Sequence, residues 1–209
     1  MRRLPYKLPG VHRPLPARRP GMHHLPTRPT WNHRSAGGLM LTDPIAAAER
    51  DIRNELQRSW TLFRPFASPL EGLWVLKEEV DELWEAVRAN DIEHAITEAT
   101  QVGAMAERLM IETGPQCFRA RAKRADSARS VVRASVELSR DERPRPAASP
   151  HEGFGYIHRA FSRLFAAVND DRPHSARIHA SAVAAEIIRF ITEARAAADP
   201  AAALKGKAS

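Results

Sequence analysis

Residues 68–113, SPLEGLWVLKEEVDELWEAVRANDIEHAITEATQVGAMAERLMIET, predict two amphipathic helices joined by a short turn. Ser68 can cap the first helix, Pro69 suits its first position, and Glu71 completes a capping box. The turn falls at residues 90–91, where an Asn-Asp pair ends one helix and caps the next. The stretch therefore predicts a helical hairpin, against which the rest of the chain packs.

Apolar side chains at helical spacing mark the buried faces of this hairpin. On the first helix they are Leu73, Leu76, Val80, Leu83 and Val87. On the second helix they are mostly small: Ala95, Ala99, Val102, Ala106 and Leu109. The distance between two packed helices depends on the side chains at their contact, so the small residues predict a close approach.

A further helix is predicted on each side of the hairpin. Upstream, Asp43 can cap a helix that has Pro44 in its first turn and that ends before Pro65. Downstream, residues 116–140 are basic and helical in composition, and a linker with two prolines follows at residues 141–148. The chain is therefore predicted to be all-α.

The hairpin pattern occurs a second time. Residues 149–153, SPHEG, repeat residues 68–72, SPLEG, at a shift of 81 positions. Over residues 68–113 the second copy is identical at 13 of 46 positions, and the cap, the turn length and the core pattern recur with it. Chance similarity of two amphipathic helices is the alternative, and these shared features weaken it.

The upstream helix recurs too, at a shift of 80, because Ala48, Ile52 and Leu56 match Ala128, Val132 and Val136. The sequence thus predicts a helical bundle of two tandem three-helix units that form a pseudo-dimer. We expect the first unit at residues 42–114, the second at residues 115–197, and a frayed, disordered tail at residues 198–209.

The net charge of +7 is unevenly distributed. Residues 1–39 hold eight basic residues and no acidic one, so the remainder carries 24 basic against 25 acidic residues. Residues 1–41 also contain seven prolines and show no periodicity, which predicts a disordered basic tail. The tail could contact an acidic partner such as nucleic acid, could be a targeting peptide, or could precede a true start at Met40; we favour that start or an inert tail.

The predicted compartment is the cytoplasm. Cys117 is the only cysteine, so no internal disulfide can form. No apolar run approaches the length of a membrane span, and the Met-Arg-Arg start lacks the apolar segment of a secretory signal. We therefore expect no membrane partner.

The acidic residues of the hairpin are candidate metal ligands. On a helical wheel, Glu79 and Glu98 each lie roughly 80° from the centre of the apolar stripe of their helix, and Glu82 lies farther round. An antiparallel pair could bring the three carboxylates together at the rim of the core. Carboxylates crowded in this way repel one another, and a hard dication such as Mg²⁺ reverses that repulsion. An ordinary acidic solvent face is the alternative.

These residues resemble a known signature. Glu79-Val80-Asp81-Glu82, followed after 15 residues by Glu98-Ala99-Thr100-Gln101, resembles the ExxE…ExxD motif of MazG-like all-α nucleoside triphosphate pyrophosphohydrolases. The resemblance covers residues 68–113, about a fifth of the chain. It implies Mg²⁺ (or Mn²⁺) held by the acids, and cleavage of a nucleoside triphosphate to the monophosphate and pyrophosphate.

One position departs from the motif. Gln101 stands where the family has Asp, and a neutral amide is a weaker Mg²⁺ ligand. The resemblance makes Glu79, Glu82 and Glu98 the catalytic metal ligands, with Gln101 in the fourth place. Lys77 and Arg108 are candidate triphosphate ligands by charge and by their place in the sequence alone.

The second copy lacks the acids. The equivalents of Glu79, Glu82, Glu98 and Gln101 are Ala160, Arg163, His179 and Ala182. The chain is thus predicted to have one live and one degenerate half. Two functions compete: a nucleotide pyrophosphohydrolase, and a catalytically inactive MazG-like scaffold. Duplication supplies a dimer interface within one chain, yet an exposed Trp74 could recruit another chain into a homo-oligomer.

Overall fold

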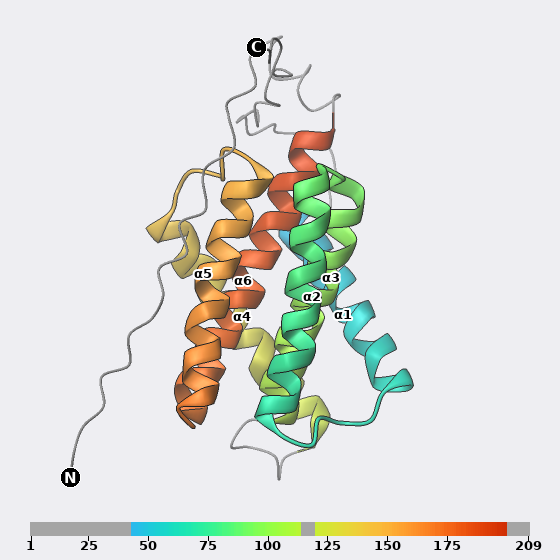
Figure 1. Cartoon of the computed structure of the whole chain (residues 1–209), viewed down its shortest axis with the longest axis vertical. Helices are drawn as coiled ribbons and strands as arrows, with labels where there is room; N and C mark the ends of the chain where they lie inside the picture. Colours follow the sequence, from blue (N-terminus) through green and yellow to red (C-terminus); the bar gives the residue numbers. More distant parts are fainter. Residues whose placement is uncertain (1–42, 114–119, 200–209) are drawn as a thin grey trace, which may run out of the picture.

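The computed structural model describes residues 43–113 and 120–199, which form six helices and no strand (Figure 1). The helices are α1 (Pro44–Leu62), α2 (Pro69–Ala89), α3 (Ile92–Glu112), α4 (Arg121–Glu142), α5 (Pro150–Asn169) and α6 (Pro173–Ala198). The predicted all-α class is confirmed for these residues. The predictions made for residues 1–41, for Cys117 and for residues 200–209 lie outside the described residues.

Local capping chemistry places the ends of the first helices where the sequence predicts them. The Asp43 carboxylate accepts a hydrogen bond from the Ile45 amide at 3.0 Å, and Ser68 Oγ accepts one from the Glu71 amide at 3.1 Å. The Glu71 carboxylate reaches back beyond the cap and accepts from the amide of Ala67. The capping box is thus one residue wider than the usual form.

The turn of the hairpin uses one residue in the left-handed region. Asn90 ends α2 with a φ of 57°, a conformation that asparagine tolerates better than most side chains. Asp91 follows as the cap of α3, and its carboxylate accepts from the His94 amide at 3.0 Å. The two helices therefore run antiparallel, which is the geometry needed to bring their acids together.

The six helices form two units of three with the same internal arrangement. In the first unit, α3 packs against α1 and α2; in the second unit, α6 packs against α4 and α5. Between the units, α3 packs on α6 and α2 on α5, while α1 reaches α6 and α4 reaches α3 (Figure 1). These contacts between the units are symmetric, as in a dimer of two equal subunits, so the predicted pseudo-dimer is present.

Aromatic side chains fill the contact between α2 and α5. Trp84 lies against Phe154 with ring centroids 4.8 Å apart, and Trp74 meets the Phe165 ring edge-on at 5.9 Å. Such pairs add to the burial of apolar surface that holds the two units together. Trp74 thus belongs to the inter-unit contact, with half of its surface still exposed.

A buried ion pair ties each unit's entry segment to its central helix. In the first unit, Arg108 donates from Nε to Glu112 at 3.0 Å and from Nη2 to the carbonyl oxygen of Arg64 at 2.5 Å. Glu112 in turn accepts from the amide of Phe66 at 2.9 Å. We call this set the arginine clasp. It gives hydrogen-bond partners to two backbone groups of the partly buried loop before α2.

The second unit contains the same clasp, shifted by 81 positions. Arg189 donates to Glu193 at 3.3 Å and to the carbonyl oxygen of Arg145 at 3.4 Å, and Glu193 accepts from the amide of Ala147 at 3.0 Å. A long-range hydrogen-bond set that recurs at the spacing of the sequence repeat is independent support for an internal duplication.

None of the helices in the described part of the chain combines the length and the apolar character required to cross a membrane.

Candidate metal centre

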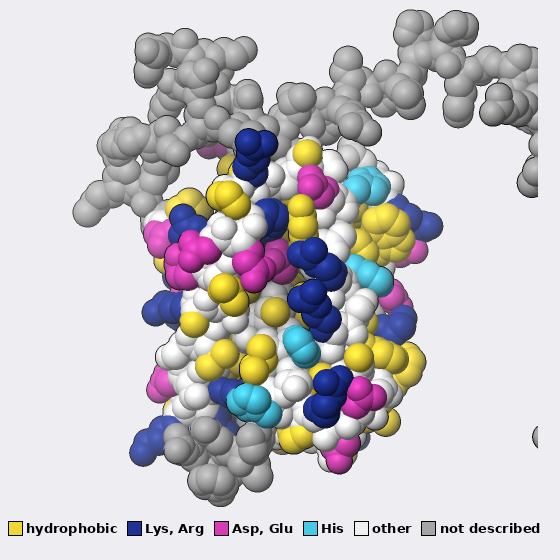
Figure 2. Space-filling view, turned by 90° about the vertical axis from the view of Figure 1, so that its left-hand side faces the viewer, with side chains coloured by type: hydrophobic (Ala, Val, Ile, Leu, Met, Phe, Trp, Pro, Cys, Tyr) yellow, Lys and Arg dark blue, Asp and Glu magenta, His cyan; other side chains and the backbone are white. Residues whose placement is uncertain are grey.

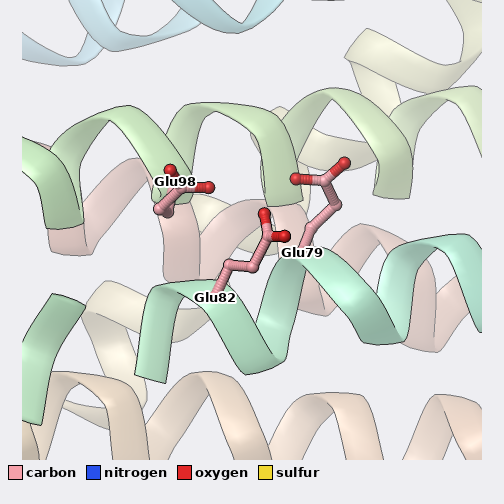
Figure 3. A group of neighbouring side chains, drawn as sticks. All are labelled: Glu79, Glu82 and Glu98. Carbon is pink, nitrogen blue, oxygen red and sulfur yellow. The ribbon is translucent and has the colours of Figure 1, made fainter. Parts of the chain in front are cut away.

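Three carboxylates converge between α2 and α3. Glu79 and Glu82 lie on α2 and Glu98 lies on α3, and one oxygen from each is within 4.8 Å of the other two (Figure 3). Figure 3 shows the two α2 side chains rising toward α3 from adjacent turns. The structure therefore brings together the three acids that the sequence singles out.

Helix geometry explains the convergence. Glu79 and Glu82 are three residues apart, so they share one side of α2. Opposite them, α3 presents buried alanines at positions 95 and 99, beside Glu98. Because these side chains are small, α3 can approach α2 closely enough for carboxylates of both helices to meet.

Burial and mutual repulsion perturb the acids. Glu98 is only 6% exposed, Glu79 is half-buried and Glu82 is exposed. Burial, together with the nearby charges of Glu82 and Glu98, raises the pKa of Glu79 to about 7. Burial and Glu82 also raise the pKa of Glu98, an effect that His94 partly offsets. The fully ionised cluster is therefore disfavoured in the metal-free protein, and the acids tend to keep a proton.

The hydrogen bonds of the three acids differ. Glu79 Oε2 is buried and has no hydrogen-bond partner among residues 43–113 and 120–199. On Glu98, His94 Nε2 lies 2.8 Å from Oε1, Gln101 Nε2 donates to Oε2 at 2.7 Å, and the carboxyl group of Glu82 shares a further hydrogen bond. A buried carboxylate oxygen without a donor costs free energy, which a bound proton or a divalent cation would offset. The residues present thus fit a hard metal ion.

Comparison with known proteins adds no relative. No protein-family model, no curated protein and no solved structure matches this chain. The resemblance to MazG-like enzymes consequently rests on the motif and on the geometry of its residues, and it stays a proposal.

The two predicted phosphate ligands lie elsewhere. Arg108 is 2% exposed and is engaged in the arginine clasp, ten residues beyond Glu98 and so about 15 Å farther along α3. Lys77 pairs with Asp81 on α2, about 200° around the helix from Glu79. The structure thus gives Arg108 a role in the fold and places Lys77 on another side of α2 from the acids.

Two residues of α1 approach the acids without having been predicted. Glu55 is close enough to Glu79 to contribute to its raised pKa, and it holds the guanidinium of Arg58 with two hydrogen bonds of 2.7 and 2.8 Å. Arg58 is half exposed and interacts electrostatically with Glu79. The signal available in the sequence was their place beside the core residues Leu56 and Ser59, which fixes the side of α1 that they occupy.

Proposed function

We propose that this protein is a Mg²⁺-dependent nucleotide pyrophosphohydrolase of the MazG-like type, acting on nucleoside triphosphates in the cytoplasm. The observation that supports it best is the convergence of Glu79, Glu82 and Glu98 within 4.8 Å, with Glu79 Oε2 buried and lacking a donor. An acidic solvent face does not require carboxylates from two helices to meet, and it does not bury one of them.

The three acids would hold Mg²⁺, or Mn²⁺, through their carboxylate oxygens. When bound, such a metal binds phosphate oxygens and lowers the pKa of a coordinated water. In the reaction, a water oxygen bonds to the α-phosphorus and the bond from that phosphorus to the oxygen bridging to the β-phosphorus breaks. The products are the monophosphate and pyrophosphate.

Glu79 would serve as a metal ligand, because burial and the charges of Glu82 and Glu98 disfavour its carboxylate until a cation offsets them. The attacking water would lose its proton to solvent, since a coordinated cation lowers the pKa of that water. Arg58 offers a positive charge beside the acids, held in place by Glu55. We therefore propose that Arg58, and not Arg108, contacts the triphosphate.

A catalytically inactive scaffold is the second candidate, and a specific observation favours it. Both oxygens of Glu98 already have hydrogen-bond partners, and one of those partners is the amide of Gln101. That amide supplies, within the protein, part of the compensation that a metal would give. If this arrangement replaces the metal, the protein keeps its fold and loses turnover.

Pyrophosphate release separates the two functions. The purified full chain would be incubated with Mg²⁺ and a panel of ribo- and deoxyribonucleoside triphosphates. We expect release from at least one nucleotide, and a loss of at least about 100-fold in Glu79→Gln, which keeps the side-chain size and removes a charged metal ligand. Glu85→Gln, an exposed acid of the same helix, is the matched control and should retain activity.

The scaffold function makes the opposite prediction. It would be supported if no nucleotide released pyrophosphate and if Mg²⁺ with nucleotide left the melting temperature unchanged. Turnover that survives unchanged in Glu79→Gln would instead remove the assignment of the reaction to this centre.

A further inference from the structure

The second unit has a pocket where the first unit has its acids. It has a volume of about 210 Å³, and its walls come from α4, α5 and α6. The pocket is lined by Ala160, Arg163 and His179, which are the equivalents of Glu79, Glu82 and Glu98. It is also lined by Ser135 and Leu138, which are the equivalents of Glu55 and Arg58 on α1. The pocket is therefore the counterpart of the candidate metal centre.

The charge of this counterpart is reversed. Arg159 and Arg163 line the pocket four residues apart on α5, where the first unit has Glu78 and Glu82. Neither arginine forms an ion pair with any residue of the described ranges, and the Arg159 guanidinium lies over the ring of Tyr156, 5.3 Å from its centroid. Figure 2, which shows the face of the molecule on the side of α5, has basic and histidine side chains gathered along its middle.

Two acids also line the pocket, and they do not cancel the arginines. Glu186 is already engaged, because it accepts from Arg143 at 2.9 Å and from Ser139 Oγ at 2.7 Å. Glu142 is exposed at the last residue of α4. Arg159 and Arg163 thus bring two positive charges to the pocket against one acid, Glu142, that has no ion pair within the described residues.

The pKa of His179 is affected by the same positive charges. Burial lowers its pKa, and the charges of Arg163 and Arg172 lower it further. The imidazole is therefore neutral at neutral pH, and it can donate one hydrogen bond into the pocket without adding repulsion to a cation. Ala160 and Ala182 stand in place of a carboxylate and an amide, which leaves space between α5 and α6.

We propose that this pocket binds a phosphate-bearing anion directly, through the guanidinium groups of Arg159 and Arg163. Two arginines on one side of a helix match the geometry of a phosphate group, which each can contact with two parallel hydrogen bonds. The first unit would hold phosphate through a metal on carboxylates, whereas the second unit holds it with no metal. This inference does not depend on the proposed hydrolase, because binding at α5 requires neither turnover nor a cation.

Calorimetric titration in EDTA tests the proposal. The full chain would be titrated with inorganic phosphate, pyrophosphate and a nucleoside monophosphate, each without divalent metal. We expect one saturable site per chain that weakens as salt increases, and at least tenfold weaker binding in Arg163→Gln and in Arg159→Gln. The tightest of the three ligands shows whether the pocket selects a free anion or the phosphate of a nucleotide.

Controls distinguish this site from general attraction to a basic protein. Arg50→Gln changes an exposed arginine of α1 that does not line the pocket, and Glu85→Gln changes an exposed acid of the first unit; both should bind as the unaltered chain does. In histidine side-chain NMR spectra, phosphate should shift the His179 signal, identified by its loss in His179→Ala. Equal binding by Arg163→Gln, Arg50→Gln and the unaltered chain, or an unmoved His179 signal, would overturn the proposal.

Discussion

Gln101 donates its side-chain amide to Glu98 at 2.7 Å, one turn farther along α3. The amide therefore stabilises the neighbouring carboxylate through a hydrogen bond, at the position where the MazG-like motif has an acid. Under the proposed function, a change at position 101 should alter both the stability of the metal-free protein and its affinity for Mg²⁺.

Gln101→Asp should lower the stability of the metal-free protein and raise its affinity for Mg²⁺. Without metal, the new carboxylate adds repulsion and removes the hydrogen bond to Glu98, so the melting temperature in EDTA should fall. With Mg²⁺, the added charge should tighten binding by about tenfold or more, which calorimetry can measure. Gln101→Asn, which keeps an amide, should bind Mg²⁺ no better than the unaltered chain. Equal Mg²⁺ affinity in all three proteins would show that no metal is held at this centre.

The pKa of Glu79 predicts how stability depends on pH. A carboxyl whose pKa is raised to about 7 in the folded state keeps its proton there, whereas the unfolded chain releases it near 4.5. The contribution to stability is therefore complete below pH 4.5 and is lost as pH rises through 7. Melting curves in EDTA between pH 5 and 8 should show this decline.

The variant Glu79→Gln isolates that contribution from others with the same sign. Glu107, buried in α3, also has its pKa raised to about 7 by burial, so the unaltered chain carries both effects. Glu79→Gln should lose part of the pH dependence and keep the part due to Glu107. Mg²⁺ should stabilise the unaltered chain more at pH 8 than at pH 6, because protons compete for Glu79. Identical pH profiles for the variant and the unaltered chain would contradict the prediction.

Removing the guanidinium of the arginine clasp should be strongly destabilising. Arg108→Ala leaves the buried Glu112 side chain without its charged partner. It also removes the hydrogen bond to the carbonyl oxygen of Arg64. We expect a loss of about 3–5 kcal/mol in the free energy of unfolding, measured by urea titration. Arg88→Ala, which breaks an exposed pair with Glu85, should change it by no more than about 0.5 kcal/mol. A loss of similar size in the two variants would disprove the role given to the clasp.

A side chain at Gly103 should be destabilising, because this residue lies where three helices meet. A Cβ atom there would stand 2.8 Å from Ile52 Cδ1 on α1 and 3.0 Å from Ile187 Cγ2 on α6. Gly103→Ala should therefore destabilise the protein by roughly 1–3 kcal/mol despite the better helix propensity of alanine.

Gly155→Ala is the matched control for that substitution. Gly155 lies within α5, and a Cβ atom there meets no atom within 4 Å. The same replacement should raise stability by up to about 1 kcal/mol, since alanine favours the helix. Melting temperatures that move in the same direction for the two variants would show that packing at Gly103 is looser than described.

Features that depend on residues close together in the sequence could be predicted, and features that depend on distant residues could not. The starts of α1 and α2 depend on neighbours within four residues, so the capping residues Asp43 and Ser68 predicted them. The convergence of the three acids needed only the periodicity of two adjacent helices. By contrast, the contact of Glu55 with Glu79 requires the placement of α1 on the hairpin, which no local pattern encodes.

The arginine clasp shows what the repeat could have revealed. Arg108 bonds to a main-chain oxygen 44 positions earlier, and a main-chain partner leaves no mark in the sequence. However, Arg108 and Glu112 recur as Arg189 and Glu193, whereas the acids of the centre do not recur. A side chain present in both units serves the architecture that both share, and one present in a single unit serves something particular to that unit.

The covalent connection of the two units has a consequence for how such a molecule can change. In an assembly of identical subunits, every substitution appears at all symmetry-related positions at once. Here a single polypeptide supplies both α2 and α5, so a replacement at Glu82 leaves Arg163 as it was. Twofold architecture is thereby retained while its two halves are free to acquire opposite chemical character.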